Sequence, residues 1–228
     1  MTRIGIMGGT FDPIHNGHLR LGSQAREEYQ LDQVWFMPSG QPPHKKDHFV
    51  TDAAVRLEMV RLAIAGRSGF ALSDFEIRRP GNTYTAQTLA LLNREYPDVL
   101  FYFIIGADSL YDIEKWYRPD LVMEQAVLLV AARDCEGAHP TLERQISYLK
   151  EKYGARIERL HSRTIHVSSE EIRTMVYNGE PLDGLLPEAV LDYVKQHGLY
   201  QMQTCTEGGR LNDRHHESCI IVSEASGN

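Results

Sequence analysis

The chain has 228 residues, of which 42% are hydrophobic and 24% charged, and its formal net charge is −7. This composition is typical of a globular protein with one large or two small domains. The acidic balance excludes a general nucleic-acid binder, which would need a broad basic stripe, and the apolar runs at 99–105 and 126–132 are too short to span a membrane. The cysteines Cys135, Cys205 and Cys219 form no close pair, which indicates a reducing, cytoplasmic setting.

Apolar runs typical of strands alternate with segments of helical periodicity along the chain. The expected strands are residues 3–7, 33–37, 70–75, 99–105, 127–132 and 156–160. The expected helices are residues 18–29, 52–65, 85–96, 108–114, 142–153, 169–177 and 187–197. Because several strands are continuous apolar runs rather than alternating ones, they suit a parallel sheet that is covered on both faces. The sequence therefore predicts an α/β fold with a doubly wound, Rossmann-like parallel sheet and helices on both faces.

The alternating pattern stops near residue 200, so we expect a single domain over residues 1–200, with a C-terminal helical part from about residue 168. Residues 201–228 are mostly polar, which predicts a flexible tail. The loop from 38 to 50 is long for a connection between a strand and a helix, which favours a functional role for it. The sequence leaves the oligomeric state open, and a homo-oligomer is compatible with it.

A glycine turn and two histidines follow the first expected strand. Gly8 and Gly9 open the turn, and His15 and His18 close it at the start of a helix. This order places backbone N–H groups and the positive end of a helix where a phosphate could bind, with two imidazoles beside it. The turn lacks the glycine patterns of a P-loop and of a dinucleotide site. A nucleoside triphosphate site, a tight turn with merely packed histidines, and a zinc site that needs a third ligand remain open.

The string GTFDPIHNGH at residues 9–18 resembles the defining motif of the nucleotidyltransferase α/β-phosphodiesterase superfamily. Its His-x-Gly-His element falls on His15 and His18, and in that superfamily the two histidines contact the phosphates of ATP. The resemblance implies a sheet of the nucleotidyltransferase type, in which the glycine turn lets the nucleotide approach the backbone. The implied ATP contacts in this turn are Gly8, Gly9, Thr10, Phe11, His15 and His18.

A second informative string, VSSEEIR at residues 167–173, opens a C-terminal helix. Ser168 and Glu171 form a capping box, and a well-capped helix is the simplest interpretation. Arg173 adds an always-charged guanidinium that suits a polyphosphate. The string resembles the superfamily motif Ile-Ser-Ser-Thr-x-x-Arg but departs from it at Glu170, whose carboxylate would be unfavourable beside phosphates unless it is turned outward or paired. The implied ATP contacts in this string are Ser168, Ser169 and Arg173.

Further strings in the middle of the chain lie in loops or directly after expected strands. They are PPHK at 42–45, TYT at 83–85, GADSL at 106–110, Trp116-Tyr117 and Arg133. Each has an ordinary alternative: Trp116 could be a core aromatic, Asp108 a helix N-cap, and Arg133 half of a surface ion pair. Because the carboxyl ends of parallel strands meet at one edge of a sheet, we expect the strings at 106–110 and Arg133 to converge on one crevice.

Together these strings resemble the bacterial nicotinate mononucleotide adenylyltransferases over about residues 1–200. The resemblance implies transfer of the adenylyl group of ATP to nicotinate mononucleotide, with deamido-NAD and pyrophosphate as products. It also implies that Gly106 and Asp108 hold the adenosine half of ATP and that Trp116 stacks on the pyridine ring. The implied acceptor contacts are His44, Lys45, Thr85, Trp116, Tyr117 and Arg133. The alternatives are nicotinamide mononucleotide and phosphopantetheine adenylyltransferases and, in another class, a non-catalytic nucleotide sensor.

The implied chemistry needs charge stabilisation rather than a general base, because the acceptor phosphate is already an anion at neutral pH. We expect His15, His18 and Arg173 to be the catalytic residues, acting on charge at the α-phosphorus of ATP. A Mg²⁺ ion is expected to arrive with ATP and to keep several waters. No protein metal site is expected, since the sequence offers no dedicated carboxylate cage. The expected partners are ATP and nicotinate mononucleotide, without nucleic acid or membrane.

Overall fold

The computed structural model describes residues 1–40, 50–131, 141–161 and 167–201. Most of the sequence-based predictions therefore fall on described residues. Three predicted site residues, His44, Lys45 and Arg133, lie outside them, as do the three cysteines and the predicted tail from residue 202 onward. None of the helices in the described part of the chain is long and apolar enough to cross a membrane.

Six parallel strands form one sheet in the order β3-β2-β1-β4-β5-β6. Their bounds are β1 Thr2–Gly9, β2 Gln33–Pro38, β3 Phe70–Leu72, β4 Val99–Gly106, β5 Val127–Ala131 and β6 Ile157–Leu160. The predicted doubly wound parallel sheet is confirmed. β1 is longer than expected because Gly8 and Gly9 still pair with β2, whereas the edge strand β3 is shorter and ends at Leu72.

Eight α-helices and one short 3₁₀ helix lie within the described residues. They are α1 Asn16–Glu28, α2 Ala53–Ile64, α3 Thr85–Glu95, α4 Ala107–Asp112, η2 Ile113–Lys115, α5 Pro119–Gln125, α6 Leu142–Tyr153, α7 Ser169–Asn178 and α8 Glu188–Gln196. Every helix expected from the sequence is present, although α1 begins at Asn16, two residues earlier than expected. α5 was not predicted, because seven residues that start with a proline show too little periodicity.

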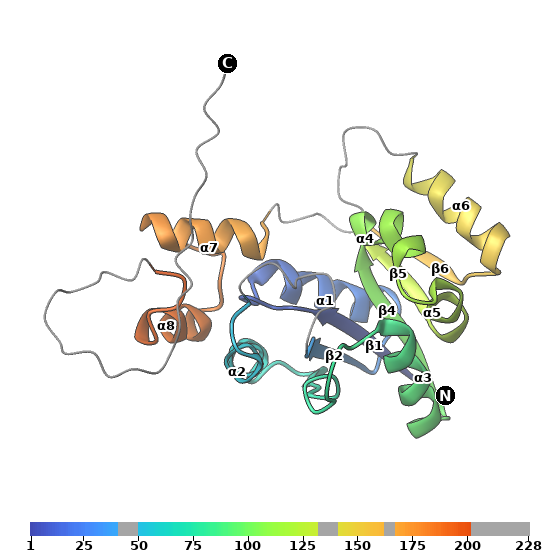
Figure 1. The fold of residues 1–228 in the computed structure, drawn as a ribbon, viewed down its shortest axis with the longest axis horizontal. Coiled ribbons are helices and arrows are strands. Elements are labelled where there is room, and N and C mark those ends of the chain that lie inside the picture. Colours follow the sequence, from blue (N-terminus) through green and yellow to red (C-terminus); the bar gives the residue numbers. More distant parts are fainter. Residues whose placement is uncertain (41–49, 132–140, 162–166, 202–228) are drawn as a thin grey trace, which may run out of the picture.

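Helices cover both faces of the sheet (Figure 1). Along β4 the side chains alternate between two cores. Phe101, Phe103 and Ile105 belong to a core completed by α3, α4, α5 and α6. Tyr102 and Ile104 belong to the opposite core, which is completed by α1, α2, α7 and α8. Both faces of β4 are therefore apolar, which explains why this strand is a continuous apolar run in the sequence.

The strand order reverses between β1 and β4, which lie side by side at the centre of the sheet. In sheets of this kind ligands bind outside the carboxyl ends of the strands at such a reversal. β1 ends at Gly9 and β4 at Gly106. α7, which comes from much later in the chain, lies near the N-terminal end of α1, and α8 packs against α2 (Figure 1). The carboxyl edge of the sheet is thus built from both early and late parts of the chain.

Candidate active site

The turn between β1 and α1 has an irregular backbone that ends at a histidine cap. Phe11 has a positive φ of 51°, and the peptide bond between Asp12 and Pro13 is cis. His15 is the N-cap of α1, and its backbone N–H donates to Nδ1 of His18 at 3.2 Å. The centroids of the two imidazole rings are 3.7 Å apart. Because Nδ1 of His18 accepts this bond, the neutral ring carries its proton on Nε2, and that nitrogen is the ring's donor.

Gly17 explains the spacing of the two histidines. A side chain at this position would place its Cβ 2.8 Å from Nδ1 of His15, closer than real Cβ contacts come. Glycine therefore lets the His15 ring lie against the first turn of α1, where the residue is only 3% exposed. The Phe11 ring meets the His18 ring edge-on, with their centroids 5.0 Å apart. The His-x-Gly-His element is thus a packed unit that fixes both imidazoles.

A buried arginine, Arg56, holds this turn from α2. Only 1% of the residue is exposed. Its guanidinium donates to the carbonyl oxygens of Thr51 at 2.8 Å, Thr10 at 2.7 Å and Ser39 at 2.9 Å. Burial lowers the pKa of Arg56 from its usual value, but a guanidinium stays charged in proteins. Sequence reasoning missed Arg56, although its place on the same helical face as Met59 was a signal that a charge is buried.

The predicted capping box at the start of α7 is present. The backbone N–H of Glu171 donates to Ser168 Oγ at 3.1 Å, and the backbone N–H of Ser168 donates to Glu171 Oε2 at 2.7 Å. Glu170, where the string departs from the superfamily motif, is exposed, and its carbonyl accepts a hydrogen bond from Thr174 Oγ1. The Glu170 side chain is therefore solvated, which removes the electrostatic conflict that a buried carboxylate would create.

Two side chains of α7 bind the backbone of the β1–α1 turn directly. Ser169 Oγ donates to the carbonyl of Pro13 at 2.9 Å. Arg173 Nη1 donates to the carbonyl of Asp12 at 2.7 Å. The structure therefore brings the two strings of the sequence, 156 residues or more apart, into one place. An arginine and two helix N-termini at one turn give a concentration of positive potential that suits a polyphosphate.

Gly106 and Asp108 lie at the carboxyl end of β4, the strand next to β1. Gly106 is the last residue of β4 and the N-cap of α4, and Asp108 lies in the first turn of that helix. A Cβ at Gly106 would collide with Oδ1 of Asp108, so glycine leaves room for the present position of this carboxylate. Asp108 is exposed and therefore accessible to a ligand at this edge.

A cavity of about 300 Å³ lies at the carboxyl ends of β1 and β2. Its walls also include the segment before α3, the first turns of α3, and the segment after η2. The cavity brings together residues from four separate strings of the sequence, because Ser109 of the string at 106–110 also lines it. The predicted site residues that line it are Gly8, Gly9, Thr10, Thr85, Trp116 and Tyr117.

The N-terminus of α3 and an aromatic ring meet at this cavity. Tyr84 is the N-cap of α3 and makes no side-chain capping bond, so the first N–H groups of the helix, beginning with Thr85, are donors for a ligand. Trp116 packs edge-to-face on Phe103, with centroids 6.3 Å apart. Tyr117 is 51% exposed, and its ring lies 4.7 Å from that of Tyr84. The cavity therefore offers a positive helix end and a flat aromatic surface to the same ligand.

Glu76 adds a carboxylate to the lining of the cavity. Thr88 Oγ1 donates to Glu76 Oε1 at 2.7 Å, and Arg79 Nη1 donates to the same hydroxyl at 3.0 Å. Burial raises the pKa of Glu76 above its ordinary value, outweighing the hydrogen bonds and the Arg79 charge that lower it. Sequence reasoning did not identify Glu76, because a single glutamate in a turn-rich segment forms no pattern.

Glu76→Gln is expected to raise the melting temperature at neutral pH, since the amide oxygen still accepts from Thr88 and the buried charge is gone. A raised folded-state pKa means that the folded protein keeps this proton to higher pH than the unfolded chain, so wild-type stability falls as pH rises through the folded pKa. In thermal melts the advantage of the variant should therefore grow as the pH rises above the ordinary pKa of a glutamate and through the raised pKa of the folded state. The exposed Glu27→Gln serves as control, and an advantage that does not depend on pH would contradict the assignment.

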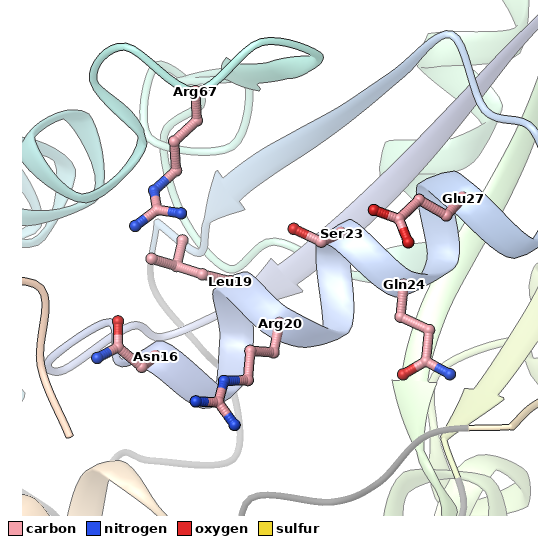
Figure 2. Close-up of a pocket in the computed structure, with 7 residues that line it drawn as sticks. All are labelled: Asn16, Leu19, Arg20, Ser23, Gln24, Glu27 and Arg67. Atoms are coloured by element: carbon pink, nitrogen blue, oxygen red, sulfur yellow. The ribbon is translucent and has the colours of Figure 1, made fainter. Parts of the chain in front are cut away.

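A larger hollow of about 590 Å³ runs along the outward side of α1 (Figure 2). Arg20 and Ser23 line it from the helix, and Arg67 reaches toward it from the segment after α2. His18 lies two positions from both Asn16 and Arg20, and residues two apart on a helix do not share a side. Among the described residues, none of the predicted site residues lines this hollow. The hollow and the cavity at the carboxyl edge of the sheet share no lining residue.

Comparison with known proteins shows close relatives. The family of cytidylyltransferase-like proteins matches residues 6–175. A probable nicotinate-nucleotide adenylyltransferase of Lachnoclostridium phytofermentans is 45% identical over 200 residues, which cover 88% of this chain and 100% of the relative. A protein of the same name from Moorella thermoacetica is 44% identical over 200 residues, covering 87% of this chain and 92% of the relative.

A solved structure is similar in fold. It is that of Plasmodium falciparum nicotinic acid mononucleotide adenylyltransferase complexed with NaAD, with a TM-score of 0.73 and 19% sequence identity over 88% of this chain and 98% of that one. At this identity the likeness concerns the fold alone, and it agrees with the predicted nucleotidyltransferase sheet. The resemblance seen in the sequence is confirmed by the family match and by the relatives at 44–45% identity. The chain belongs to the nicotinate-nucleotide adenylyltransferase family of nucleotidyltransferases.

Proposed function

We propose that this chain transfers the adenylyl group of ATP to nicotinate mononucleotide, forming deamido-NAD and releasing pyrophosphate. The observation that carries the proposal is the 300 Å³ cavity, which joins the glycine turn of β1 to the N-terminus of α3 and to Trp116. The names of the curated relatives and the NaAD complex of the structural neighbour support the same reaction. Nicotinate mononucleotide has the groups that this cavity can recognise: a negative carboxylate, a flat ring and a phosphate.

In this proposal the pyridine carboxylate binds at the N-terminus of α3, beside Thr85. The backbone N–H groups there donate to it, and the helix dipole favours its negative charge. The neutral amide of nicotinamide mononucleotide has no charge to interact with the dipole, so it binds more weakly. Trp116 supplies the surface on which the pyridine ring stacks. Its position in the lining supports this role, because its ring is already held against Phe103.

ATP binds between the β1–α1 turn and α7, with its adenosine half at the end of β4. The proposed ATP contacts in these two segments are Gly8, Gly9, Thr10, Phe11, His15, His18, Ser168, Ser169 and Arg173. Gly106 and Asp108 are the proposed adenosine contacts. Ser169 and Arg173 support this placement because both are bonded to the turn itself. His44, Lys45 and Arg133 are proposed acceptor contacts that lie outside the described residues.

The reaction joins two anions, so the main task of the protein is to position them and to offset their charge. A phosphate oxygen of the acceptor attacks the α-phosphorus of ATP, and the bond to the β-phosphate oxygen breaks as pyrophosphate leaves. His18 donates from Nε2 and Arg173 from its guanidinium toward the charge that develops at the α-phosphoryl group. The N-terminus of α1 adds its dipole at the same place. No general base is needed, because the attacking oxygen already carries negative charge.

A Mg²⁺ ion bound to ATP is part of the proposal. Such an ion would supply positive charge that offsets the negative charge of the ATP phosphates. Among the described residues no group of three or more His, Cys, Asp or Glu side chains is arranged to hold a metal ion. The residues present fit an ion that keeps phosphate oxygens and waters as its ligands, which is the usual preference of Mg²⁺ beside a nucleotide.

Pyrophosphate release with ATP and different acceptors tests the proposal. We expect fast release with nicotinate mononucleotide and much slower release with nicotinamide mononucleotide or phosphopantetheine. A preference for either of the other acceptors would overturn the assignment of the α3 end as a carboxylate site. ATP binding without release on any acceptor would instead indicate a nucleotide sensor.

Trp116→Ala is expected to raise the KM for nicotinate mononucleotide about tenfold or more, because stacking of a base on an aromatic side chain typically contributes about 1–3 kcal/mol. The dissociation constant for ATP, measured by calorimetry, should stay close to that of the wild type. Trp116→Phe keeps a ring that can stack and should recover most of the acceptor affinity. Equal losses of affinity for ATP and for the acceptor would count against a stacking role.

A further inference from the structure

Tyr200, close to the end of the described chain, is bonded to the turn near the N-terminus. Its phenol O–H donates to Oδ1 of Asp12 at 2.6 Å, across 188 positions of sequence. Asp12 is only 2% exposed, and its Oδ2 accepts the backbone N–H of Thr51 at 3.1 Å. Burial, together with the Asp12 carboxylate, raises the pKa of Tyr200. The phenol therefore keeps its proton and acts as the donor in this bond.

Tyr200 is held in this position by packing as well as by the hydrogen bond. Its backbone has a positive φ of 63°, a conformation that side-chain-bearing residues seldom adopt. The ring packs against the core between the sheet and α2, and the hydroxyl oxygen lies 3.9 Å from Sδ of Met59. A disfavoured backbone conformation persists only where the surrounding contacts hold it in place. For Tyr200 these contacts are the packing of the ring and the hydrogen bond to Asp12.

Asp12 lies in the turn whose carbonyl oxygens are held by other elements. Side chains of α2 and α7 donate to the carbonyls of Thr10, Asp12 and Pro13. One of these donors is Arg173, which binds the backbone carbonyl of Asp12. Tyr200 binds the side-chain carboxylate of the same residue. A buried carboxylate that lost its hydroxyl donor would need another donor. Arg56 also faces this carboxylate, but its guanidinium is bound to three backbone carbonyls. Arg173 already reaches the same residue through its carbonyl, and a guanidinium is a strong donor to a carboxylate. A new bond of this kind would compete with the phosphates of ATP for Arg173.

We propose that Tyr200 is a positioning residue for the phosphate-binding turn: by satisfying Asp12 it fixes residues 10–13 and leaves Arg173 available to the polyphosphate. This inference rests on the proposed function only where it predicts an effect of Tyr200 on turnover. The contact itself, and its effect on the order of the turn, do not depend on which acceptor the enzyme uses. The segment after α8 is accordingly part of the catalytic unit, although it does not touch the reacting atoms.

The test uses Tyr200→Phe in the full chain, which removes the hydroxyl and keeps the ring. We expect kcat to fall about tenfold, as for the loss of one hydrogen bond to a charged group, while the KM for the acceptor stays within about twofold because the α3 end of the cavity is not involved. Backbone amides of residues 9–18 should exchange with deuterium severalfold faster than in the wild type, with or without substrate. Tyr177→Phe is the matched control, because Tyr177 is an exposed tyrosine on α7 and its variant should behave as wild type.

A double variant tests whether Tyr200 acts through Asp12. If it does, adding Tyr200→Phe to an Asp12→Asn chain should change kcat by less than about twofold, because the carboxylate that needs the hydroxyl is already gone. Additive losses would overturn the proposal, as would wild-type kcat and wild-type amide exchange in the single variant. A kcat loss matched by unfolding at the assay temperature would also overturn it, since it would show a merely structural role. Absence of pyrophosphate release from the wild type would refute the proposed function. The deuterium-exchange measurement would still show whether the Tyr200 contact orders the turn.

Discussion

His18→Ala is expected to lower kcat for pyrophosphate release by about 100-fold or more, because removal of one charge contact to a transition state typically costs on the order of 3 kcal/mol. The neutral His18 ring has the tautomer that this contact requires. Its Nδ1 is engaged by the backbone N–H of His15, so Nε2 carries the proton. Its ring is also wedged between those of His15 and Phe11, which keeps it from reorienting as the reaction proceeds.

The same variant should lose little stability. The alanine removes one acceptor at the start of α1, and the loss of a helix cap costs about 1 kcal/mol. A melting curve recorded beside the kinetics would show a fall of a few degrees, far too small to unfold the enzyme at the assay temperature. His197→Ala, at the exposed end of α8, is the control for loss of a histidine elsewhere and should keep wild-type turnover. Near-normal turnover of His18→Ala would refute its catalytic role.

Arg56→Ala is expected to have the largest effect on stability, lowering the free energy of unfolding by about 3 kcal/mol or more. The variant would leave the carbonyls of Thr10, Ser39 and Thr51 without their buried donor. It would also remove the positive charge that faces the buried Asp12 carboxylate. Urea unfolding followed by circular dichroism measures the loss.

Arg61→Ala on the same helix is the matched control. Arg61 is exposed and pairs with Glu58 one turn away, and surface pairs of this kind contribute little. Its free energy of unfolding should stay close to that of the wild type. If both arginine variants lost the same stability, the effect would come from the helix propensity or the net charge, and the role of Arg56 as a clamp would be wrong.

Several features of the fold and the site could be predicted because they rest on short stretches of sequence. The apolar run at 100–105 indicates a strand buried on both faces, because every side chain of such a strand meets a core. The capping box of Ser168 and Glu171 is likewise a local bond between neighbours in the sequence. The exact start of α1 was less predictable, because His15 serves as an N-cap although it is not one of the usual capping residues.

Other features could not be predicted, because they depend on residues that only the folded chain brings together. Arg56 and Thr10 are 46 positions apart, and Asp12 and Tyr200 are 188 apart. Nothing in the local sequence of α2 or of the segment after α8 marks these partners. Glu76 similarly acquires its raised pKa from burial, which is a property of the cavity and not of its neighbours in the sequence.

Local patterns in the sequence specify the α/β alternation, the glycine turn with its two histidines and the second string that carries Arg173. These are patterns of periodicity, turn chemistry and capping, which act over a few residues. The tertiary structure alone decided that α7 is bonded to the β1–α1 turn, that the cavity joins this turn to α3 and Trp116, and that Arg56 and Tyr200 support the turn. These contacts depend on the whole fold because a buried carbonyl or carboxylate takes its hydrogen-bond partner from the groups that pack beside it. Which groups pack beside it cannot be read from any one segment.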